Sequence, residues 1–271
     1  MRRTGPGALL ALFALMLMPT GCAEGAGDAP SAPGLGAVAD ASEGVWVPIF
    51  DGETLDGWSA KIAGYPFGEN FGDTFRVEDG VIRAVFDQYG DDYRDRFGNL
   101  IYETPYRHYR LRLEYRFTGE QVPGAPEWAK RNSGVLYHMQ PPETVALDQD
   151  FPVSLEAQFL AEGAHAPTTG NMCSIGTSVA VDGTRPDDHC LPGTAAARPM
   201  GEWVRFELQA LPGGVFRHLI DGEVSLTYSD ALYDEAVPWA EGMAVTNGHF
   251  GLQSESHPVE FRNIEIMVLE D

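Results

Sequence analysis

The chain has 271 residues, of which 44% are hydrophobic, and its 40 acidic residues outnumber its 18 basic residues to give a formal net charge of −22 at pH 7. A surface this acidic repels the phosphates of nucleic acids and the headgroups of anionic lipids, so neither is expected as a partner. The same charge disfavours an anionic substrate. The simplest interpretation of the charge is solubility after export.

The N-terminus has the pattern of an export signal. Two arginines precede the apolar run 8–18, which predicts a signal peptide over 1–21. The run is too short to span a bilayer. Cys22 follows Thr-Gly as in the lipobox of bacterial lipoproteins, although Pro19 stands where that motif usually has an aliphatic residue. We predict a lipid anchor at Cys22 as the only contact with the membrane of the bacterial cell envelope; secretion without an anchor is the alternative.

The rest of the chain divides into a tether and one domain. Residues 22–44 are rich in Ala, Gly, Pro and Ser, which predicts a disordered tether. The remainder, 45–271, has the length of a single all-β domain. It consists of short alternating runs separated by Gly, Asp, Asn and Pro, without sustained helical periodicity. This pattern predicts a jelly roll of two antiparallel sheets.

The expected strands follow one another at short intervals. The dipeptide Asp79-Gly80 is a strong hairpin signal, and the segment that follows 159 and carries two cysteines is expected to be a loop. In chain order the predicted strands are 46–50, the hairpin 75–85, 100–102, 109–117, 131–140, 153–159, 203–210, 216–220, 224–228, 250–254 and 259–268.

Three of these strands carry polar side chains where apolar residues would pack better. Because side chains alternate along a strand, each set falls on one face. A row of polar groups on a curved sheet predicts a sugar-binding trough, and a solvated outer face is the alternative. The three sets are Asn132 with His138, Ser154 with Glu156 and Gln158, and Gln253 with Glu255 and His257, with Arg262 just beyond.

Three histidines are candidates for proton transfer, because histidine titrates near neutral pH. His138 is the best candidate for a base, and a hydrogen-bonded structural histidine is the alternative. His189 lies on the cysteine-bearing loop and is expected to reach over the trough. His257 lies in a turn, where capping the strand is the alternative. We assign no role to the remaining histidines, His108, His165, His218 and His249.

Cys173 and Cys190 are the two cysteines of the predicted domain. In an exported chain they favour a disulfide that closes a loop in the wall of the trough. A metal site formed by both cysteines and His189 is the alternative.

The polar strand lacks the acids of an ordinary glycosidase. Laminarinase-like jelly rolls carry Glu-x-Asp-x-Glu on their central strand, whereas the corresponding positions here are Glu156, Gln158 and Leu160. A retaining double displacement, which needs two carboxyls beside the bond, is therefore poorly supported.

Six segments resemble the family of 3-keto-disaccharide hydrolase domains, long described as a domain of unknown function. They are IFDGETLDGW at 49–58, FRVEDGVI at 75–82, RNSGVLYH at 131–138, DFPVSLEAQFL at 150–160, PTTGNMCSIGT at 167–177 and LQSESHPVEFRNIEI at 252–266. The resemblance covers 45–269 and implies a concanavalin-like jelly roll, often in exported bacterial lipoproteins. It also implies cleavage of glycosides that carry a ketone at carbon 3 of the sugar.

Such a ketone makes the hydrogen at carbon 2 acidic, so one base can start a β-elimination that expels the group on carbon 1, after which water adds. The reaction needs a base, a donor or cation at the enolate oxygen, and an acid for the leaving group. The sequence requires no cofactor, although a divalent cation held by Glu156 and a histidine could stabilise the enolate. The hypothesis assigns His138 or Glu156 as base, His189 or His257 as the second proton-transfer group, and Arg131, Asn132, Gln158, Gln253 and Arg262 as substrate contacts.

The competing hypothesis is a carbohydrate-binding module without catalysis, since jelly rolls also serve as lectins. It predicts binding of unoxidised glycans on an aromatic platform formed by Trp58, Trp128 or Trp239. A purely structural envelope protein is a third class. The sequence leaves open the aglycone, the anomer, the oligomeric state and the choice between hydrolase and lyase.

Overall fold

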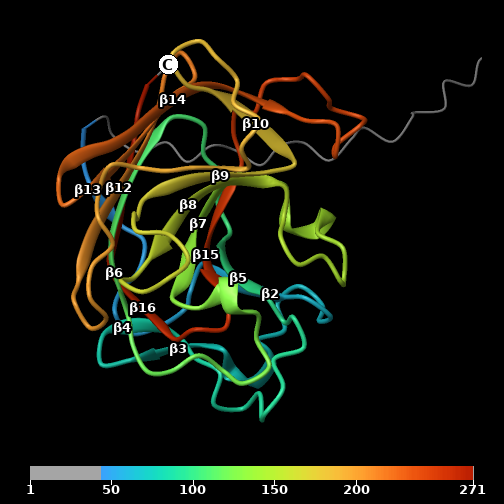
Figure 1. Cartoon of the computed structure of the whole chain (residues 1–271), viewed down its shortest axis with the longest axis vertical. Helices are drawn as coiled ribbons and strands as arrows, with labels where there is room; N and C mark the ends of the chain where they lie inside the picture. Colours follow the sequence, from blue (N-terminus) through green and yellow to red (C-terminus); the bar gives the residue numbers. More distant parts are fainter. Residues whose placement is uncertain (1–43, 271) are drawn as a thin grey trace, which may run out of the picture. The chain divides into compact units, whose positions relative to one another are not determined.

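The computed structural model describes residues 44–270. The predicted signal peptide, the anchor residue Cys22 and all but the last residue of the predicted tether lie outside the described residues. Within 44–270, no helix has the length and apolar character that a membrane crossing needs. The chain forms two antiparallel sheets and three short 3-10 helices (Figure 1), so the predicted all-β jelly roll is confirmed. The helices are η1 (Phe71–Asp73), η2 (Glu127–Ala129) and η3 (Pro142–Thr144).

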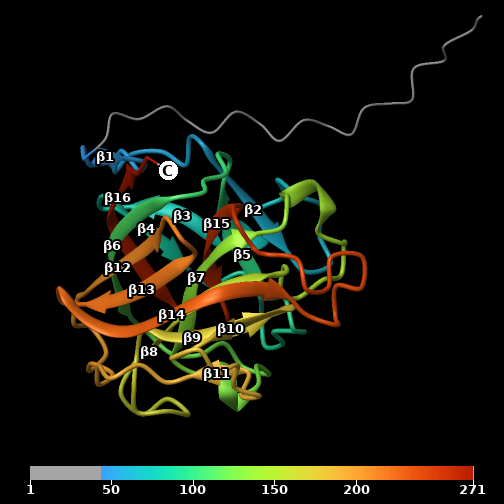
Figure 2. The ribbon, with the colours of Figure 1, turned by 90° about the horizontal axis from the view of Figure 1, so that it is seen from above.

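The first sheet, called sheet A, has nine strands. Figure 2 shows its strands β6, β12, β13 and β16 side by side in one layer. In spatial order its strands are β10 (Thr177–Ala180), β14 (Glu223–Tyr233), β13 (Val215–Ile220), β12 (Val204–Leu211), β6 (Tyr109–Phe117), β16 (Val259–Val268), β4 (Val81–Ala84) and β3 (Phe75–Glu78), with β1 (Val47–Pro48) also paired to β16.

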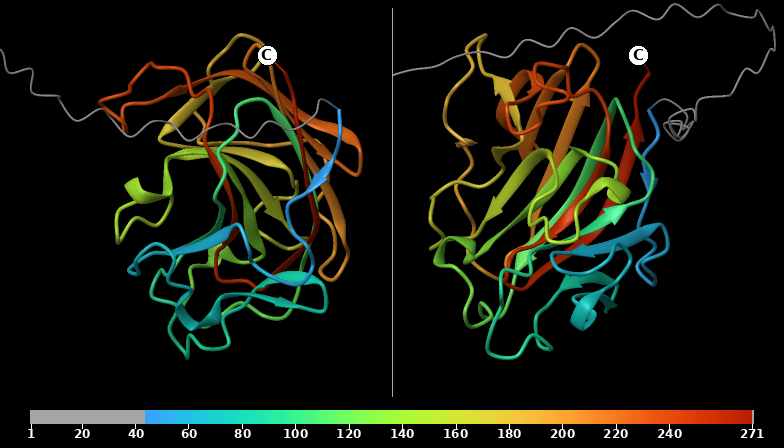
Figure 3. Two further views of the ribbon diagram at one scale, coloured as in Figure 1. Left: turned by 180° about the vertical axis from the view of Figure 1, so that it is seen from behind. Right: turned by 90° about the vertical axis from the view of Figure 1, so that its right-hand side faces the viewer.

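The second sheet, called sheet B, has seven strands and carries the polar positions singled out in the sequence. Figure 3 shows both sheets from two further sides. In spatial order the strands of sheet B are β11 (Cys190–Leu191), β9 (Asn171–Ile175), β8 (Ser154–Leu160), β7 (Asn132–Met139), β15 (His249–Ser254), β5 (Gly98–Tyr102) and β2 (Trp58–Ile62).

Strand β6 shows how alternation builds the core between the sheets. Its nine residues are alternately buried and partly exposed, as the sequence predicts. Tyr115 of β6 stacks on Phe159 of β8 with ring centroids 4.0 Å apart, which joins the two sheets. On the outer face, Arg110 of β6 donates to Glu207 of β12 at 2.7 Å, so the solvent side of sheet A is covered by ion pairs.

The cysteine-bearing segment differs from the predicted loop. Cys173 lies on β9 and Cys190 on β11, directly opposite each other in an antiparallel pair. The same segment also supplies β10, which pairs with β14 of sheet A. These strands are only two to five residues long, so their sequence carries little strand signal. Pairing of β9 with the longer strand β8 stabilises them.

The outward face of sheet B is covered rather than solvated. Strands β7 and β8 are buried along their whole length, which requires cover on both faces. A second apolar cluster lies among the loops, away from the main core, and consists of Phe86, Tyr89, Tyr93, Phe97, Val122 and Ala129. The alternative of a freely solvated polar face is therefore wrong for these strands.

Candidate functional site

A cavity of about 370 Å³ lies on the outward face of sheet B. Pockets that bury a small ligand usually measure about 300–1,000 Å³. Its lining residues are Trp128, Asn132, Phe151, Glu156, Gln158, His165, Cys173, Ile175, His189, Cys190 and Glu255. We call this space the sheet B cavity.

Pairing between strands fixes the floor of the cavity. Gln158 of β8 lies opposite Asn171 of β9, and Glu156 lies opposite Cys173. Because the side chains two apart on β8 share a face, Glu156 and Gln158 both point away from the core. The sequence therefore predicts the orientation of this strand correctly.

Gly134 of β7 provides room in the middle of the floor. A Cβ atom at this position would lie 3.0 Å from Oε1 of Glu156 and 3.1 Å from Oε1 of Gln253, which approach it from the two neighbouring strands. It would also lie 2.7 Å from the backbone oxygen of Ala157. Only glycine permits this arrangement of the two side chains.

Two buried carboxyl groups face the sheet B cavity. Glu156 is 5% exposed and Glu255 is 2% exposed. Burial raises the pKa of Glu156 to about 8. Burial also raises the pKa of Glu255 well above its usual range, and the neighbouring Glu156 raises it further. The pair therefore holds at least one proton at neutral pH.

Several buried polar atoms around the cavity have no hydrogen-bond partner among the described residues. Buried polar atoms are normally satisfied by protein or by ordered water. Their concentration here means that ordered water or a polar ligand must satisfy them. These atoms are Oε1 of Glu156, Oε2 of Glu255, Oδ1 of Asn132 and both amide atoms of Gln253.

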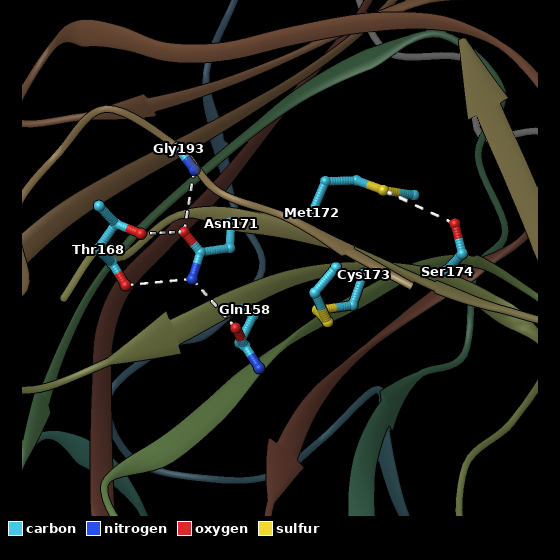
Figure 4. The surroundings of a disulfide bond; sticks show 8 residues. Gln158, Thr168, Asn171, Met172, Cys173, Ser174 and Gly193 are labelled. Carbon is cyan, nitrogen blue, oxygen red and sulfur yellow. Dashed lines mark hydrogen bonds between the residues drawn. A yellow bond between two sulfur atoms is a disulfide. The ribbon is translucent and has the colours of Figure 1, made fainter. Parts of the chain in front are cut away.

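A hydrogen-bond chain orients the amide of Gln158 (Figure 4). Asn171 donates through Nδ2 to Oε1 of Gln158 at 3.1 Å, and its own Oδ1 accepts from the Thr168 hydroxyl at 2.8 Å and from the Gly193 amide at 3.0 Å. Since Oε1 of Gln158 points to Asn171, its Nε2 points away from Asn171. The amide is thus held ready to donate to a ligand.

The predicted disulfide is confirmed. Cys173 and Cys190 are bonded, with Cα atoms 4.1 Å apart, and both line the cavity. The alternative metal site is wrong, because the sulfur atoms bond each other. Within 44–270, no group of three or more His, Cys, Asp or Glu residues could hold a metal ion.

His138 lies in the core, so the prediction that it faces the cavity with Glu156 is wrong. Its φ of 44° coincides with a register shift between β7 and β15, and this irregularity reverses the alternation after Tyr137. The ring lies 5.9 Å from that of Tyr109 and 5.2 Å from that of Phe216. Burial lowers its pKa to about 4, so it is neutral.

Arg262 is also misplaced by the sequence prediction. It lies on β16 of sheet A, where its Nε donates to Glu114 at 2.7 Å and its guanidinium lies 3.9 Å from the ring of Trp203. Arg262 follows Gln253 closely in the sequence, but β16 pairs with β6 in sheet A, whereas Gln253 lies on β15 of sheet B. It is an outer-face ion pair, not a substrate contact.

His257 and Arg131 do not line the cavity either. His257 is buried with its ring edge-on to Phe117, 5.9 Å away. Burial lowers its pKa to about 4, and the positive charges of Arg131 and Lys130 add to the effect. Arg131 donates to the backbone oxygen of Glu162. Arg131 is held by this bond, whereas both ring nitrogens of His257 are buried without a hydrogen-bond partner among the described residues.

Another hollow, with a volume of about 570 Å³, lies on the outer face of sheet A. Its charged side chains are already paired, for example Arg112 with Glu265 at 2.7 Å and Glu114 with Arg262 at 2.7 Å. It contains none of the buried unpaired atoms of the sheet B cavity, which is therefore the better candidate site.

The structure brings together only part of the predicted set. Glu156, Asn132, Gln158 and His189 line the cavity, and Gln253 adjoins it. Sequence reasoning placed Glu255 in the polar row with Gln253 but did not identify it as a partner of Glu156. It also missed Phe151 and His165, and it considered Trp128 only as part of a binding platform. These three residues lie on segments without a periodic pattern.

Jelly rolls include lectin domains, and the amides and carboxyls on the floor of this cavity are polar groups of the kind that fix a small ligand. Residues 45–267 match the family described as 3-keto-alpha-glucoside-1,2-lyase-like domain, and the chain belongs to this family. The predicted family is thus confirmed. No curated protein gives a match.

Solved structures agree with the fold. Two putative glycosyl hydrolases from Parabacteroides distasonis ATCC 8503 are similar: one has 18% identity and a TM-score of 0.52 over 83% of this chain and 94% of its own. The other has 17% identity and a TM-score of 0.51 over 83% and 100%. The carbohydrate binding module CBM66 from Bacillus subtilis has 9% identity and a TM-score of 0.48 over 78% and 95%.

Proposed function

We propose that the protein cleaves glycosides whose sugar carries a ketone at carbon 3, and that Glu156 and Glu255 transfer the protons. The observation that supports this most is the pair of buried carboxyls on one cavity, with the pKa of Glu156 raised to about 8. A general base works best when its pKa lies near the working pH. Membership of the family supports the choice of substrate.

In the first step the carboxylate of Glu156 takes the proton from carbon 2, and the electron pair of the C–H bond moves toward the ketone. The negative charge that develops on the ketone oxygen needs donors. The Nε2 group of Gln158 and the unpaired amide of Gln253 are donors beside Glu156.

In the second step the bond between carbon 1 and the glycosidic oxygen breaks, and its electron pair goes to that oxygen. Glu255 is the more suitable acid, because its pKa is raised by burial and by Glu156. It protonates the leaving oxygen, so an enone and a free alcohol form. The reverse sequence, with Glu255 as base and Glu156 as acid, adds water to the enone and yields the hydrolysed keto-sugar.

An ordinary double displacement uses one carboxyl as acid and a second, ionised carboxylate as nucleophile. The proposed elimination also uses one protonated and one ionised carboxyl, so the raised pKa values of Glu156 and Glu255 do not distinguish the two reactions. Membership of the family favours the elimination, and a comparison of oxidised and unoxidised substrates tests the choice.

The test compares methyl 3-keto-glucoside with unoxidised methyl glucoside. Glu156→Gln and Glu255→Gln are each expected to lower turnover of the keto-glycoside by roughly 10²–10⁴-fold. Glu120→Gln, a change at an exposed glutamate, is the matched control and is expected to have no effect. Cleavage of the unoxidised glucoside at the same rate, or full activity in both cavity variants, would contradict the proposal.

The aromatic platform of a pure binding module has less support. Trp58 is buried and donates to the backbone oxygen of Ile49 at 2.8 Å, and Trp239 does not line the sheet B cavity. Trp128 alone of the three lines the cavity. Binding alone gives no reason to bury two carboxyls side by side at the cost of raising their pKa values.

We also propose, from the sequence, that the protein is exported and acylated at Cys22 in a bacterial cell envelope. Metabolic labelling with a radioactive fatty acid tests this, with Cys22→Ser as the matched variant. Label that persists in the Cys22→Ser variant would contradict the anchor.

A further inference from the structure

The sheet B cavity has a wall whose chemistry differs from that of its floor. The floor carries carboxyl and amide groups, whereas Trp128 from the short helix η2 and Phe151 from a loop line the same space. Ile175 and the disulfide extend the apolar part of the lining. We call Trp128 and Phe151 the aromatic wall.

The aromatic wall is held in place before any ligand binds. Trp128 stacks on Phe97 with centroids 5.4 Å apart and planes 18° from parallel. Phe97 is buried, and it also contacts Phe151 at 4.9 Å. Trp128 nevertheless remains 45% exposed, so one ring face rests on Phe97 while much of the rest stays open. A rigid, half-exposed indole beside a polar floor is a preformed stacking surface.

The floor and the wall select different parts of a glycoside. The unpaired atoms of Glu156, Glu255 and Gln253 require hydrogen bonds, which the hydroxyls and ketone of a sugar supply. The aromatic wall offers only the indole N–H of Trp128 as a polar group. Hydroxyls buried against it would lose hydrogen bonds to water without replacement, which costs free energy. His165 and His189 are exposed and lie at the rim.

We propose that the aromatic wall binds the leaving group, and that the preferred substrates are 3-keto-glycosides with an aromatic aglycone. The inference rests on the proposed function, because the leaving group is defined by the cleaved bond. When carbon 2 loses its proton, the electron pair of the C1–O bond goes to the aglycone oxygen. That oxygen gains a proton and departs as an aromatic alcohol, so atoms and charge balance.

The experiment compares benzyl and methyl 3-keto-glucosides. Both release a primary alcohol, so a difference in rate reports the contact of the ring rather than the quality of the leaving group. We expect kcat/KM to be roughly 10-fold higher for the benzyl compound, since burial and stacking of one ring are worth about that factor or more. Trp128→Ala is expected to remove this preference, so that the variant turns over the benzyl and methyl compounds with kcat/KM values within about twofold of each other.

Two further variants keep the test decisive. Trp128→Phe retains a stacking ring and is expected to keep most of the preference. Trp239→Ala removes a tryptophan that is 82% exposed and does not line the cavity, and it is expected to change nothing. Folding of each variant is checked by near-ultraviolet circular dichroism.

The outcomes separate this inference from the proposed function. Turnover of both compounds at equal rates in the wild type, or an equal loss for both in Trp128→Ala, would overturn the aromatic-aglycone site while the proposed function stands. Absence of all turnover would overturn the proposed function. In that case quenching of Trp128 fluorescence by benzyl glucoside, absent in Trp128→Ala and absent with methyl glucoside, would still support the aromatic wall as a ring-binding surface, and no quenching would overturn both.

Discussion

Glu156 of β8 and Glu255, which directly follows β15, face one cavity, and Glu156 raises the pKa of Glu255 beyond the effect of burial. Two carboxyls that influence each other in this way titrate as a pair, with the first proton released more easily than the second. The singly ionised pair contains a base and an acid at once. This is the state that the proposed elimination requires.

The pH dependence of turnover is the first prediction. Below about pH 8 the carboxyl of Glu156 gains a proton and cannot act as base. We therefore expect kcat/KM for methyl 3-keto-glucoside to fall about 10-fold for each pH unit below that value. At higher pH a second fall is expected when Glu255 loses its proton. A flat profile between pH 5 and 8 would contradict the assignment, and Glu120→Gln should keep the wild-type profile.

The free energy of unfolding should depend on pH in the opposite direction to turnover. The folded-state pKa of Glu156 lies above its unfolded value of 4.5, so between these values the folded state binds more protons. The free energy of unfolding therefore decreases as pH rises through this range, by up to about 1.4 kcal/mol per pH unit for one such group. The buried histidines His138 and His257 have the reverse effect below pH 6.5. Their pKa values are lowered to about 4, so the free energy of unfolding rises with pH between about 4 and 6.5.

Urea unfolding between pH 6.5 and 8 isolates the carboxyl effect. Glu156→Gln cannot ionise, so the loss of stability across this window should be smaller in the variant than in the wild type, by about 1 kcal/mol or more. Glu120→Gln controls for a general change in charge. An identical slope in Glu156→Gln and wild type would show that Glu156 titrates normally.

Gly134→Ala provides a third prediction about the floor. The added methyl group would lie 2.7 Å from the backbone oxygen of Ala157 and close to Glu156 and Gln253. We expect turnover to fall by roughly 10²-fold or more and stability to fall by about 1–3 kcal/mol. Gly251→Ala on β15 is the matched control, because its nearest contacts would be 3.4 Å, an ordinary distance. Equal effects of the two changes would remove the special role of Gly134.

Much of the fold and one strand of the site could be predicted from the sequence. Alternation along 109–117 and 153–159 reports which face each side chain occupies, and the structure agrees at Glu156 and Gln158. The alternation rule fails at His138, where the register shift inserts an irregularity. No local sequence pattern predicts this register shift.

The missing half of the site depends on contacts between distant segments. Glu255 directly follows β15 and faces the same cavity as Glu156 of β8, because β15 and β8 both neighbour β7. The sequence of neither strand reveals this strand order. Trp128 and Phe151 are brought together by loops packed on the second apolar cluster. Arg262 is the opposite case, because it is close to Gln253 in the sequence but lies on the other sheet.

His218 illustrates a buried polar network that the proposed chemistry does not use, and its loss is the last prediction. Its Nδ1 lies 3.0 Å from the backbone oxygen of Gly170, so this nitrogen donates. Its Nε2 therefore accepts, from the hydroxyls of Tyr137 at 3.0 Å and Tyr228 at 2.8 Å. Burial lowers its pKa to about 4, which agrees with a neutral ring.

Replacing His218 with Phe retains an aromatic ring but leaves two tyrosine hydroxyls and one backbone oxygen without partners in the core between the sheets. We expect the free energy of unfolding to fall by about 2–4 kcal/mol, measured by urea unfolding at pH 7. His165→Phe, a change at an exposed histidine, should stay within about 0.5 kcal/mol of the wild type. Equal stability of His218→Phe and wild type would mean that the hydroxyls find other partners, and that this network does not determine how the sheets pack.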